Sequence, residues 1–303
     1  MIALHGQGWR DRGRAEAQWH ASLRDYAYPV MGSKPVDKIT TSDVLAVLVP
    51  IWHAKAETAR RVRQRIGAVM RWAVAEGHRQ DNPAGDAIAA ALPKHSDRRQ
   101  HHLALPHDKV GAAVCAVRAS HAHAATKLAF EFLVLTAARS GEVRGARWDE
   151  IDPDAAVWTI PAERTKTARA HRVPLSRRAI EVLTAARSHN DGEQLVFASV
   201  SGVVMSDSTM SKLARELGLG MAPHGARASF RSWCADTAVP RACRQRRRGR
   251  LPAQRSAQIR AHTMEQWAQC LARPTPTLGV GGRDVVGTEC GWPANTPAVH
   301  HYT

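Results

Sequence analysis

The sequence predicts a mainly α protein of two domains with one small β-hairpin or sheet. Along most of its 303 residues, apolar side chains recur at steps of three and four, which is the period of amphipathic helices. A polar and basic stretch at 93–103 lacks that period and predicts an exposed linker between two domains. The segment VWTIPAERTKTARAHRVPLS instead has the pattern of two short strands around a polar tip.

Residues 1–92 are the first predicted domain, a small helical bundle. Thr40 and Asp43 have capping-box spacing at the start of a helix, and Gly77 followed by Asn82 and Pro83 ends the third helix. Each helix carries one apolar stripe that we expect to be buried: Trp19, Leu23 and Tyr26; Val44, Leu48 and Ile51; Val62, Ile66, Val69 and Ala73.

The third helix, within ETARRVRQRIGAVMR, is rich in arginine. Five arginines lie largely away from its apolar stripe: Arg60, Arg61, Arg63, Arg65 and Arg71. Guanidinium groups on such a face can reach phosphate oxygens, so we expect this helix to lie along DNA. The alternative is an ordinary solvated face, which the scarcity of acids beside these arginines disfavours.

Residues 104–240 are the second predicted domain, which is mostly helical. Helical spacing occurs in LPHDKVGAAVCAVR, HAATKLAFEFLVLTAAR, RRAIEVLTAARS, SDSTMSKLARELG and PHGARASFRSWCADT, with LVFAS as a short extended piece. From residue 241 the chain becomes Arg-dense and then rich in Gly, Pro and Thr, so for 241–303 we expect an aberrant tail with little regular structure. Within it TMEQWAQCLA, residues 263–272, has the spacing of a short amphipathic helix.

The charge balance favours a polyanionic partner. Lys and Arg total 43 against 27 Asp and Glu, which gives a formal net charge of +16 and a pI near 10.6. Nucleic acid is therefore the leading candidate. Part of the excess lies in the Arg-dense stretch after Pro240, where a solvated tail is the alternative interpretation. No stretch resembles a signal peptide or approaches the length of a membrane span, so we expect no membrane partner.

Cysteine and histidine predict neither a disulfide framework nor a metal site. The five cysteines lie far apart without a C-x-x-C pair, and their odd number favours a reducing, cytoplasmic setting. Three histidines in the linker region and three more by His123 invite a metal hypothesis. Without cysteine or carboxylate partners at ligand spacing, a solvated surface is the better interpretation.

Four residues of the second domain suit phosphoryl transfer without a metal or nucleotide cofactor: Arg139, Lys166, His224 and Arg227. Arginine can hold a phosphodiester with two hydrogen bonds, lysine can protonate a departing oxygen, and histidine can assist either role. Each residue also has a structural alternative. Arg139 could pair with Glu142 at helical spacing, His224 could cap its helix, and a lysine in a basic hairpin is normally solvated.

Three stretches carry a family resemblance: LTAARSGEVRGARWDEID, IPAERTKTARAHRVPLS and PHGARASFRSW. Motif for motif, they resemble the catalytic domain of tyrosine recombinases. The stretch from QWHASLRDYAYPV to RWAVAEG is similar to the core-binding domain of P4-like prophage integrases, so the resemblance covers about 15–240. It implies two domains that clamp duplex DNA at attachment sites, a tetramer on two duplexes, and no metal or nucleotide. The N-terminal arm-binding domain usual in the family is expected to be absent.

The resemblance gives the four residues roles. Arg139 in TAARSGE matches the first catalytic arginine, and Lys166 in RTKT matches a hairpin lysine that resembles a general acid. His224 and Arg227 match the H-x-x-R pair of the family. The family mechanism also needs a tyrosine that attacks the scissile phosphate and forms a 3′-phosphotyrosyl bond.

The sequence departs from the family pattern at that tyrosine, so the nucleophile is not identified. Only Tyr26, Tyr28 and Tyr302 are present; we expect the first two on a buried or domain-facing side, and Tyr302 lies too far beyond the H-x-x-R pair. The L-x-H and A-Y-x-R-S motifs are missing, although PAQRSA echoes the second with Ala253 in the tyrosine's place, and MEQWAQCLA resembles the family's closing helix. A frameshift or small deletion between residues 241 and 262 would explain these departures.

Two functions follow from these observations. With a nucleophile, the protein would be a site-specific recombinase that cuts and rejoins DNA in integration and excision. Without one, it would be a catalytically dead DNA-binding remnant that forms no covalent intermediate. A basic transcriptional regulator of unrelated mechanism would leave the ordered Arg, Lys, His and Arg motifs unexplained.

Overall fold

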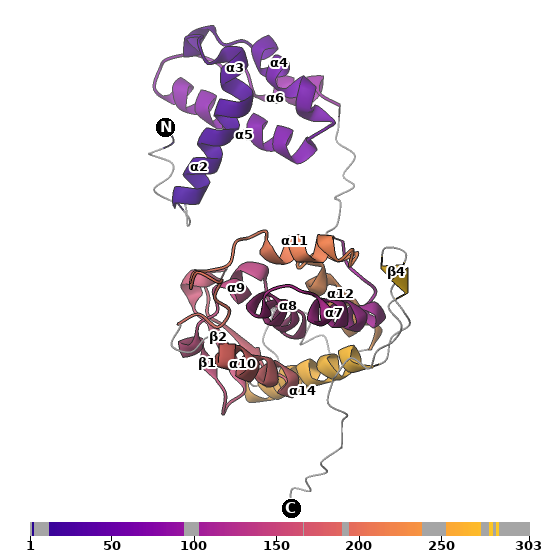
Figure 1. Cartoon of the computed structure of the whole chain (residues 1–303). Coiled ribbons are helices and arrows are strands. Elements are labelled where there is room, and N and C mark those ends of the chain that lie inside the picture. The colour runs from indigo at the N-terminus through magenta and orange to yellow at the C-terminus, as the bar shows by residue number, and fades with distance from the viewer. Residues whose placement is uncertain are drawn as a thin grey trace, which may run out of the picture. The chain divides into compact units, whose positions relative to one another are not determined.

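The computed structural model divides the chain into two compact units, residues 1–99 and 100–303 (Figure 1). The division between residues 99 and 100 lies inside the predicted linker at 93–103. The structure describes residues 2, 12–93, 103–165, 167–189, 194–237, 253–273, 279–280 and 283–284.

The first unit is a helical bundle, as the hydrophobic period predicted. Its helices are α2 (Arg12–Ser22), a π-helical turn (Leu23–Ala27), α3 (Tyr28–Met31), a 3₁₀ turn (Val36–Lys38), α4 (Thr41–Trp52), α5 (Ala56–Ala75) and α6 (Asp86–Ala91). The predicted capping box is confirmed, because the Asp43 backbone N–H donates to Thr40 Oγ1 at 3.3 Å and the Thr40 backbone N–H donates to Asp43 Oδ2 at 3.0 Å. Beyond α5, Gly77 adopts φ +75°, a conformation that glycine accepts without steric cost.

The predicted apolar stripes form the core of this unit. Val44 and Leu48 of α4 and Val62 of α5 are fully buried, and Ile66 and Leu23 are nearly so. Contacts between α4 and α5, and between α5 and the π-helical turn, bring these side chains into one cluster. Burying such aliphatic side chains stabilises a fold by about 1.5–3 kcal/mol each, so this core is the main source of the unit's stability.

The second unit is mostly helical with a small sheet. Its elements are α7 (Val110–Ala119), α8 (Ala124–Thr136), α9 (Ser140–Arg144), β1 (Ile151–Asp152), β2 (Val157–Ile160), β3 (His171–Pro174), α10 (Arg177–His189), α11 (Thr209–Glu216), α12 (Gly225–Asp236), α14 (Ala253–Ala272), β4 (Gly279–Val280) and β5 (Arg283–Asp284). The predicted strand pair is β2 and β3, which pair antiparallel with Trp158 opposite Val173. β1 adds a third strand in the order β1-β2-β3.

Helix α8 is the centre of the second unit. It contacts α7, α9, α10, α11, α12 and α14, and Figure 1 shows it among them. Phe130, Phe132 and Leu133 are fully buried, and residues on every side of the helix are covered. A helix that is apolar all round belongs inside a domain. The two ends of α8 and its neighbours therefore have fixed positions, and Arg139 follows one of those ends.

Residues 253–272 form the 20-residue helix α14, so the helix predicted at 263–272 is confirmed and the irregular tail predicted at 253–262 is wrong. Trp267 is fully buried, and its Nε1 donates to the Val134 carbonyl at 2.9 Å. At Gly111 on α7, an added Cβ would lie 2.3 Å from the Leu271 carbonyl oxygen, so the two backbones are in direct contact. The spacing of Met264 and Trp267 indicated the second half of this helix, whereas residues 253–262 have few apolar side chains that could show a helical period. The remaining residues of the predicted tail lie outside the described part, except for β4, β5 and Arg273.

One cysteine departs from the sequence expectation. Cys115 on α7 is disulfide-bonded, whereas Cys234 and Cys270 are not part of a disulfide. Spacing along the chain could not indicate this bond, because it depends on which cysteines approach one another in the fold.

None of the helices in the described ranges is long and apolar enough to cross a membrane. Within the same ranges, no three His, Cys, Asp or Glu side chains are grouped in a way that could hold a metal ion.

Candidate active site

Two guanidinium groups come together at the C-terminal end of α8, from positions 88 residues apart in the sequence (227 − 139). Arg139 is the N-cap of α9, and Arg227 lies in the first turns of α12. Arg227 Nη1 donates to the carbonyl oxygen of Ala137, two residues before Arg139. Burial, and after it the positive charge of Arg139, lowers the pKa of the Arg227 guanidinium. The fold thus assembles the two arginines that the sequence predicted.

The buried carboxylate of Glu142 orients the first of these arginines, Arg139. Glu142 accepts hydrogen bonds from the Arg139 backbone N–H at 2.9 Å and from Arg139 Nη1 at 2.5 Å. The predicted structural alternative, an Arg139–Glu142 pair, is therefore present. It does not exclude a functional role, because a guanidinium has five N–H donors and the Arg139 side chain is still 37% exposed. One carboxylate faces two guanidinium groups, so the site keeps a net positive charge.

His224 precedes α12 and is exposed. Its side chain makes no capping hydrogen bond, so the predicted alternative of a helix cap is wrong. The next residue, Gly225, is required by close packing, since an added Cβ would lie 2.0 Å from the Leu103 carbonyl oxygen. The segment over it is held by Ala222 N–H, which donates to Leu103 at 2.9 Å, and by Ser229 Oγ, which donates to Leu105 at 2.6 Å. The H-G-A-R spacing thus places an exposed imidazole beside a partly buried arginine.

Lys166 lies outside the described residues, in the connection between β2 and β3. Thr165, the residue before it, is buried and hydrogen-bonds to Arg169. Thr165 Oγ1 accepts from the Arg169 backbone N–H at 3.2 Å and donates to the Arg169 carbonyl at 2.7 Å. The role of Lys166 as a general acid stays a prediction.

The carbonyl that receives Arg227 belongs to a residue in a strained conformation. Ala137 is the C-cap of α8 and adopts φ +47°, ψ +30°, which is left-handed and costs a non-glycine residue roughly 1–2 kcal/mol. Ala137→Gly keeps the carbonyl and relieves the strain, so it is expected to leave the melting temperature unchanged or raise it. Ala137→Val adds a β-branched side chain at the same φ and is expected to destabilise the protein by about 1–3 kcal/mol. Thermal melts of the two variants measure this, and equal melting temperatures would show that the conformation carries no strain.

The five arginines of α5 differ in their surroundings. Arg60 and Arg61 are exposed and both pair with Glu57, Arg61 at 2.8 Å. Arg63 is half-buried and Arg71 is exposed; neither side chain has an ion pair or hydrogen bond to another residue of the part that the structure describes. Four arginines against one nearby glutamate leave this helix with a basic surface.

Arg65 holds the first unit together instead of extending from it. Its Nη1 donates to the Gln18 carbonyl at 2.8 Å and to Ser22 Oγ at 2.5 Å, and its guanidinium lies 5.6 Å from the centre of the Trp19 ring. Burial lowers the pKa of Arg65, with a smaller effect from the charge of Arg61. These contacts join α2 to α5, so we infer a structural role for Arg65 and no longer propose it as a DNA contact.

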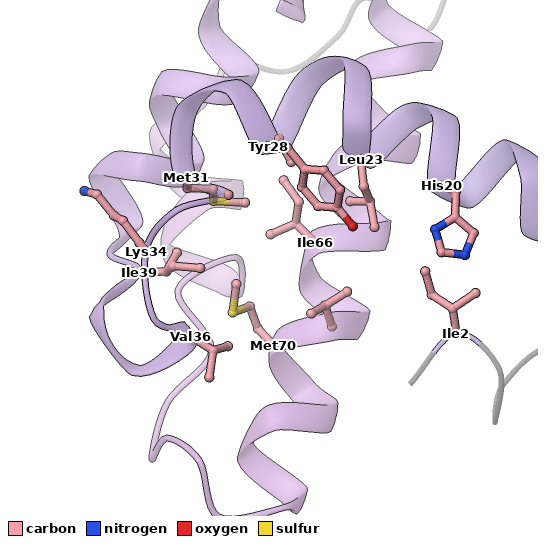
Figure 2. A pocket seen from close by; sticks show the side chains of 13 residues that line it. Ile2, His20, Leu23, Tyr28, Met31, Lys34, Val36, Ile39, Ile66 and Met70 are labelled. Atoms are coloured by element: carbon pink, nitrogen blue, oxygen red, sulfur yellow. The ribbon is translucent and has the colours of Figure 1, made fainter.

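Tyr26 and Tyr28 belong to the first unit, whereas Arg139 and Arg227 belong to the second. Tyr26 is half-buried and its hydroxyl accepts from Lys55 Nζ at 3.3 Å. Tyr28 is 51% exposed, so of the two expected positions, buried or domain-facing, the buried one is wrong. Tyr28 lines an apolar pocket of about 420 Å³ between α2, α3 and α5, together with Leu23, Met31 and Ile66 (Figure 2). Tyr302 lies outside the described residues.

Three residues of the site were not predicted from the sequence: Glu142 as an orienting group, Gly225, and Arg164, whose Nη2 donates to the backbone carbonyl of Glu142. Glu142 had the only available signal, its helical spacing from Arg139. The close approach of the Leu103 segment to Gly225 and the contact from Arg164 depend on tertiary packing that no local pattern contains.

Two family models match the chain. The phage integrase central domain matches residues 1–90, and the phage integrase family domain matches residues 104–247. The integrase of Enterobacteria phage P4 is 31% identical over 231 residues, which cover 66% of this chain and 52% of that protein. Prophage integrase IntZ of Escherichia coli K12 is 35% identical over 177 residues, 58% of this chain and 42% of the relative. The chain thus spans about half the length of these curated relatives.

Solved structures share the fold. A dimer of lambda integrase bound to a core site superposes with a TM-score of 0.61 at 21% identity, covering 82% of this chain and 88% of that one. The integrase of transposon Tn1549, in complex with circular intermediate DNA, gives a TM-score of 0.58 at 13% identity and covers 85% and 90% of the two chains. At these identities the likeness shows the fold alone.

Proposed function

The chain belongs to the phage integrase family, and we propose that it is a site-specific recombinase that binds duplex DNA and breaks and rejoins its strands in integration or excision. One observation carries the proposal: Arg139 and Arg227 meet at the end of α8, held by Glu142 and by the Ala137 carbonyl. This arrangement fits a phosphodiester, because its two non-bridging oxygens can each accept from a guanidinium.

The chemistry follows from where charge develops. When a nucleophile attacks phosphorus, negative charge grows on the non-bridging oxygens, and fixed donors lower the barrier most where water is excluded. Arg227 is partly buried and Arg139 is preset by Glu142, so neither has to reorganise as the charge grows. His224 at the edge of the site can donate to the same phosphate, and Lys166 would protonate the departing 5′ oxygen.

The second candidate is a DNA-binding remnant that does not cut. The sequence favours it, since no tyrosine occurs between Arg227 and Tyr302. The fragment that echoes the family's tyrosine motif coincides with the start of α14, and Ala253 stands in the tyrosine's place. Alanine has no group that can attack phosphorus, so strand cleavage requires either Tyr302 or a nucleophile from outside the chain.

A covalent-capture experiment separates the two candidates. Selection from a random duplex pool first identifies a bound sequence, and a nicked duplex of that sequence is then incubated with the protein. A recombinase gives a protein–DNA adduct that survives detergent and is lost in Tyr302→Phe. Sequence-selective binding without any adduct favours the remnant, and binding without sequence selection argues against both.

The partners follow from the same proposal. Lambda integrase has been solved as a dimer on a core site and as a tetramer on a Holliday junction. We propose that this chain likewise acts on double-stranded DNA, as a homotetramer if it is active, in the cytoplasm where bacterial and phage DNA lies. The domains we propose are residues 1–92 for core binding and 104–240 for catalysis, with α14 added to the second.

The basic face of α5 should contact phosphates in the first unit. Replacing Arg60, Arg61 and Arg63 with glutamine is expected to flatten the dependence of duplex affinity on salt, because each lost phosphate contact lowers the log–log slope by about 0.9. Arg65→Gln is the contrasting variant, since its side chain binds α2: we expect a lower melting temperature and an unchanged slope. Fluorescence anisotropy over a series of salt concentrations measures both, and a slope that the triple variant leaves intact would exclude α5 from the interface.

A further inference from the structure

We infer that Arg164 is a positioning residue for Arg139: it fixes α9 against the sheet, and through α9 it sets the guanidinium that binds phosphate. The inference rests on the proposed phosphate site and adds a residue to it. Arg164 lies in the connection between β2 and β3, two residues before Lys166. Its side chain is 23% exposed and is directed to protein groups at both ends of its guanidinium.

The first of those groups belongs to α9. Arg164 Nη2 donates to the Glu142 carbonyl oxygen at 2.6 Å. Helix α9 has only five residues, so its last carbonyls have no partner within the helix and need one from outside. A guanidinium near the C-terminal end also complements the helix dipole. Arg164 therefore stabilises a helix that is too short to hold its own geometry.

The second group is the buried carboxylate of Glu150, which accepts from Arg164 Nη1. Glu150 also accepts from Trp158 Nε1 at 3.0 Å, and Trp158 on β2 is fully buried. The carboxylate is thus anchored to the sheet. Gly145 leaves the space that Arg164 occupies, since an added Cβ there would lie 3.0 Å from Nη2.

Glu142 connects these contacts to the site. Its carbonyl is held by Arg164, and its carboxylate binds the backbone N–H and Nη1 of Arg139. A shift of α9 would therefore move Arg139 relative to Arg227. Lysine has a single ammonium group and cannot reproduce the two-pronged contact of Arg164, even though it keeps the charge.

A double-mutant cycle on duplex affinity tests the inference in the full chain. Arg139→Gln is expected to weaken binding about tenfold, the loss of one charge-assisted contact. Arg164→Lys should weaken binding by a similar factor, and the double variant should bind no more weakly than Arg139→Gln alone, because both changes remove the same contact. A lysine that only loosens the fold would instead weaken binding by the same factor in either background.

The control is Arg118→Lys, which alters another buried arginine–glutamate pair of the same unit and should leave affinity unchanged. Thermal melts accompany each variant, and if Arg164→Lys does not fold, Glu150→Gln breaks the same bridge from its other side. Additive effects of the two substitutions, or unchanged affinity in Arg164→Lys, overturn the inference while leaving the phosphate site in place. Unchanged affinity in Arg139→Gln itself overturns the proposed phosphate site, and the inference with it.

Discussion

Replacing Trp267 with alanine is expected to lower the free energy of unfolding by about 3–5 kcal/mol, the usual cost of removing a buried tryptophan. The indole is fully buried and packs 5.3 Å from the Trp233 ring and 5.5 Å from the Phe230 ring, measured between ring centroids. Its Nε1 also donates to Val134 on α8. The substitution would leave a cavity between α8, α12 and α14 and remove one of the hydrogen bonds to the Val134 carbonyl oxygen.

Urea denaturation of the full chain, followed by circular dichroism, measures this loss. Gln266→Ala is the matched control, because Gln266 is the exposed neighbour of Trp267 on the same helix and should change stability little. If Trp267→Ala and Gln266→Ala unfold at the same urea concentration, α14 does not belong to the core. The result bears on function, because α14 begins where the family pattern has its nucleophile.

The second large effect is expected from Glu131→Ala, at about 3–5 kcal/mol, because it removes the buried carboxylate that compensates the charges of two partly buried arginines. The Glu131 side chain is 2% exposed and accepts from Arg118 Nε at 2.7 Å and from Arg178 Nε at 2.8 Å. Hydrogen bonds to Glu131 and Glu181 raise the pKa of Arg178 despite its burial. The carboxylate therefore joins α7 and α10 through α8.

Glu181→Ala is the control for this prediction, since Glu181 binds the same Arg178 from a more exposed position. It should cost less than about 1 kcal/mol, as partly exposed ion pairs do. Replacing Glu131, Arg118 and Arg178 together with methionine should recover much of the lost stability, because no charge is then left buried. A small effect of Glu131→Ala alone would mean that water reaches both arginines.

The sequence predicted those parts of the fold whose signal is local. The capping box at Thr40 and the stripe around Val44 and Leu48 depend on neighbours a few residues away, and both are confirmed. β1, with two residues, and α9, with five, are too short to show a period. Helix α14 was recognised in only half its length, because its first half has few apolar residues.

The candidate site shows the same division. Arg139, His224 and Arg227 were identified from motifs that resemble a family, and the structure brings the two arginines together. No spacing rule predicted the Arg227 contact with Ala137 or the bridge from Arg164, because both join segments far apart in the chain. Arg65 carried the same signal as Arg60 and Arg61, and tertiary contacts with α2 distinguish it. Local sequence motifs therefore identified the candidate site residues, whereas the groups that hold those residues in place are known only from the tertiary packing.

We propose above all that Arg139 and Arg227 together hold one DNA phosphate. The most direct measurement is duplex affinity against salt concentration for the wild type, the Arg139→Gln/Arg227→Gln variant, and Arg177→Gln, which removes an exposed arginine of α10. The double variant is expected to lose about 0.9 from the log–log slope, as one phosphate contact requires, while Arg177→Gln keeps the wild-type slope. A wild-type slope in the double variant would contradict this proposal, because the two guanidinium groups would then bind no phosphate.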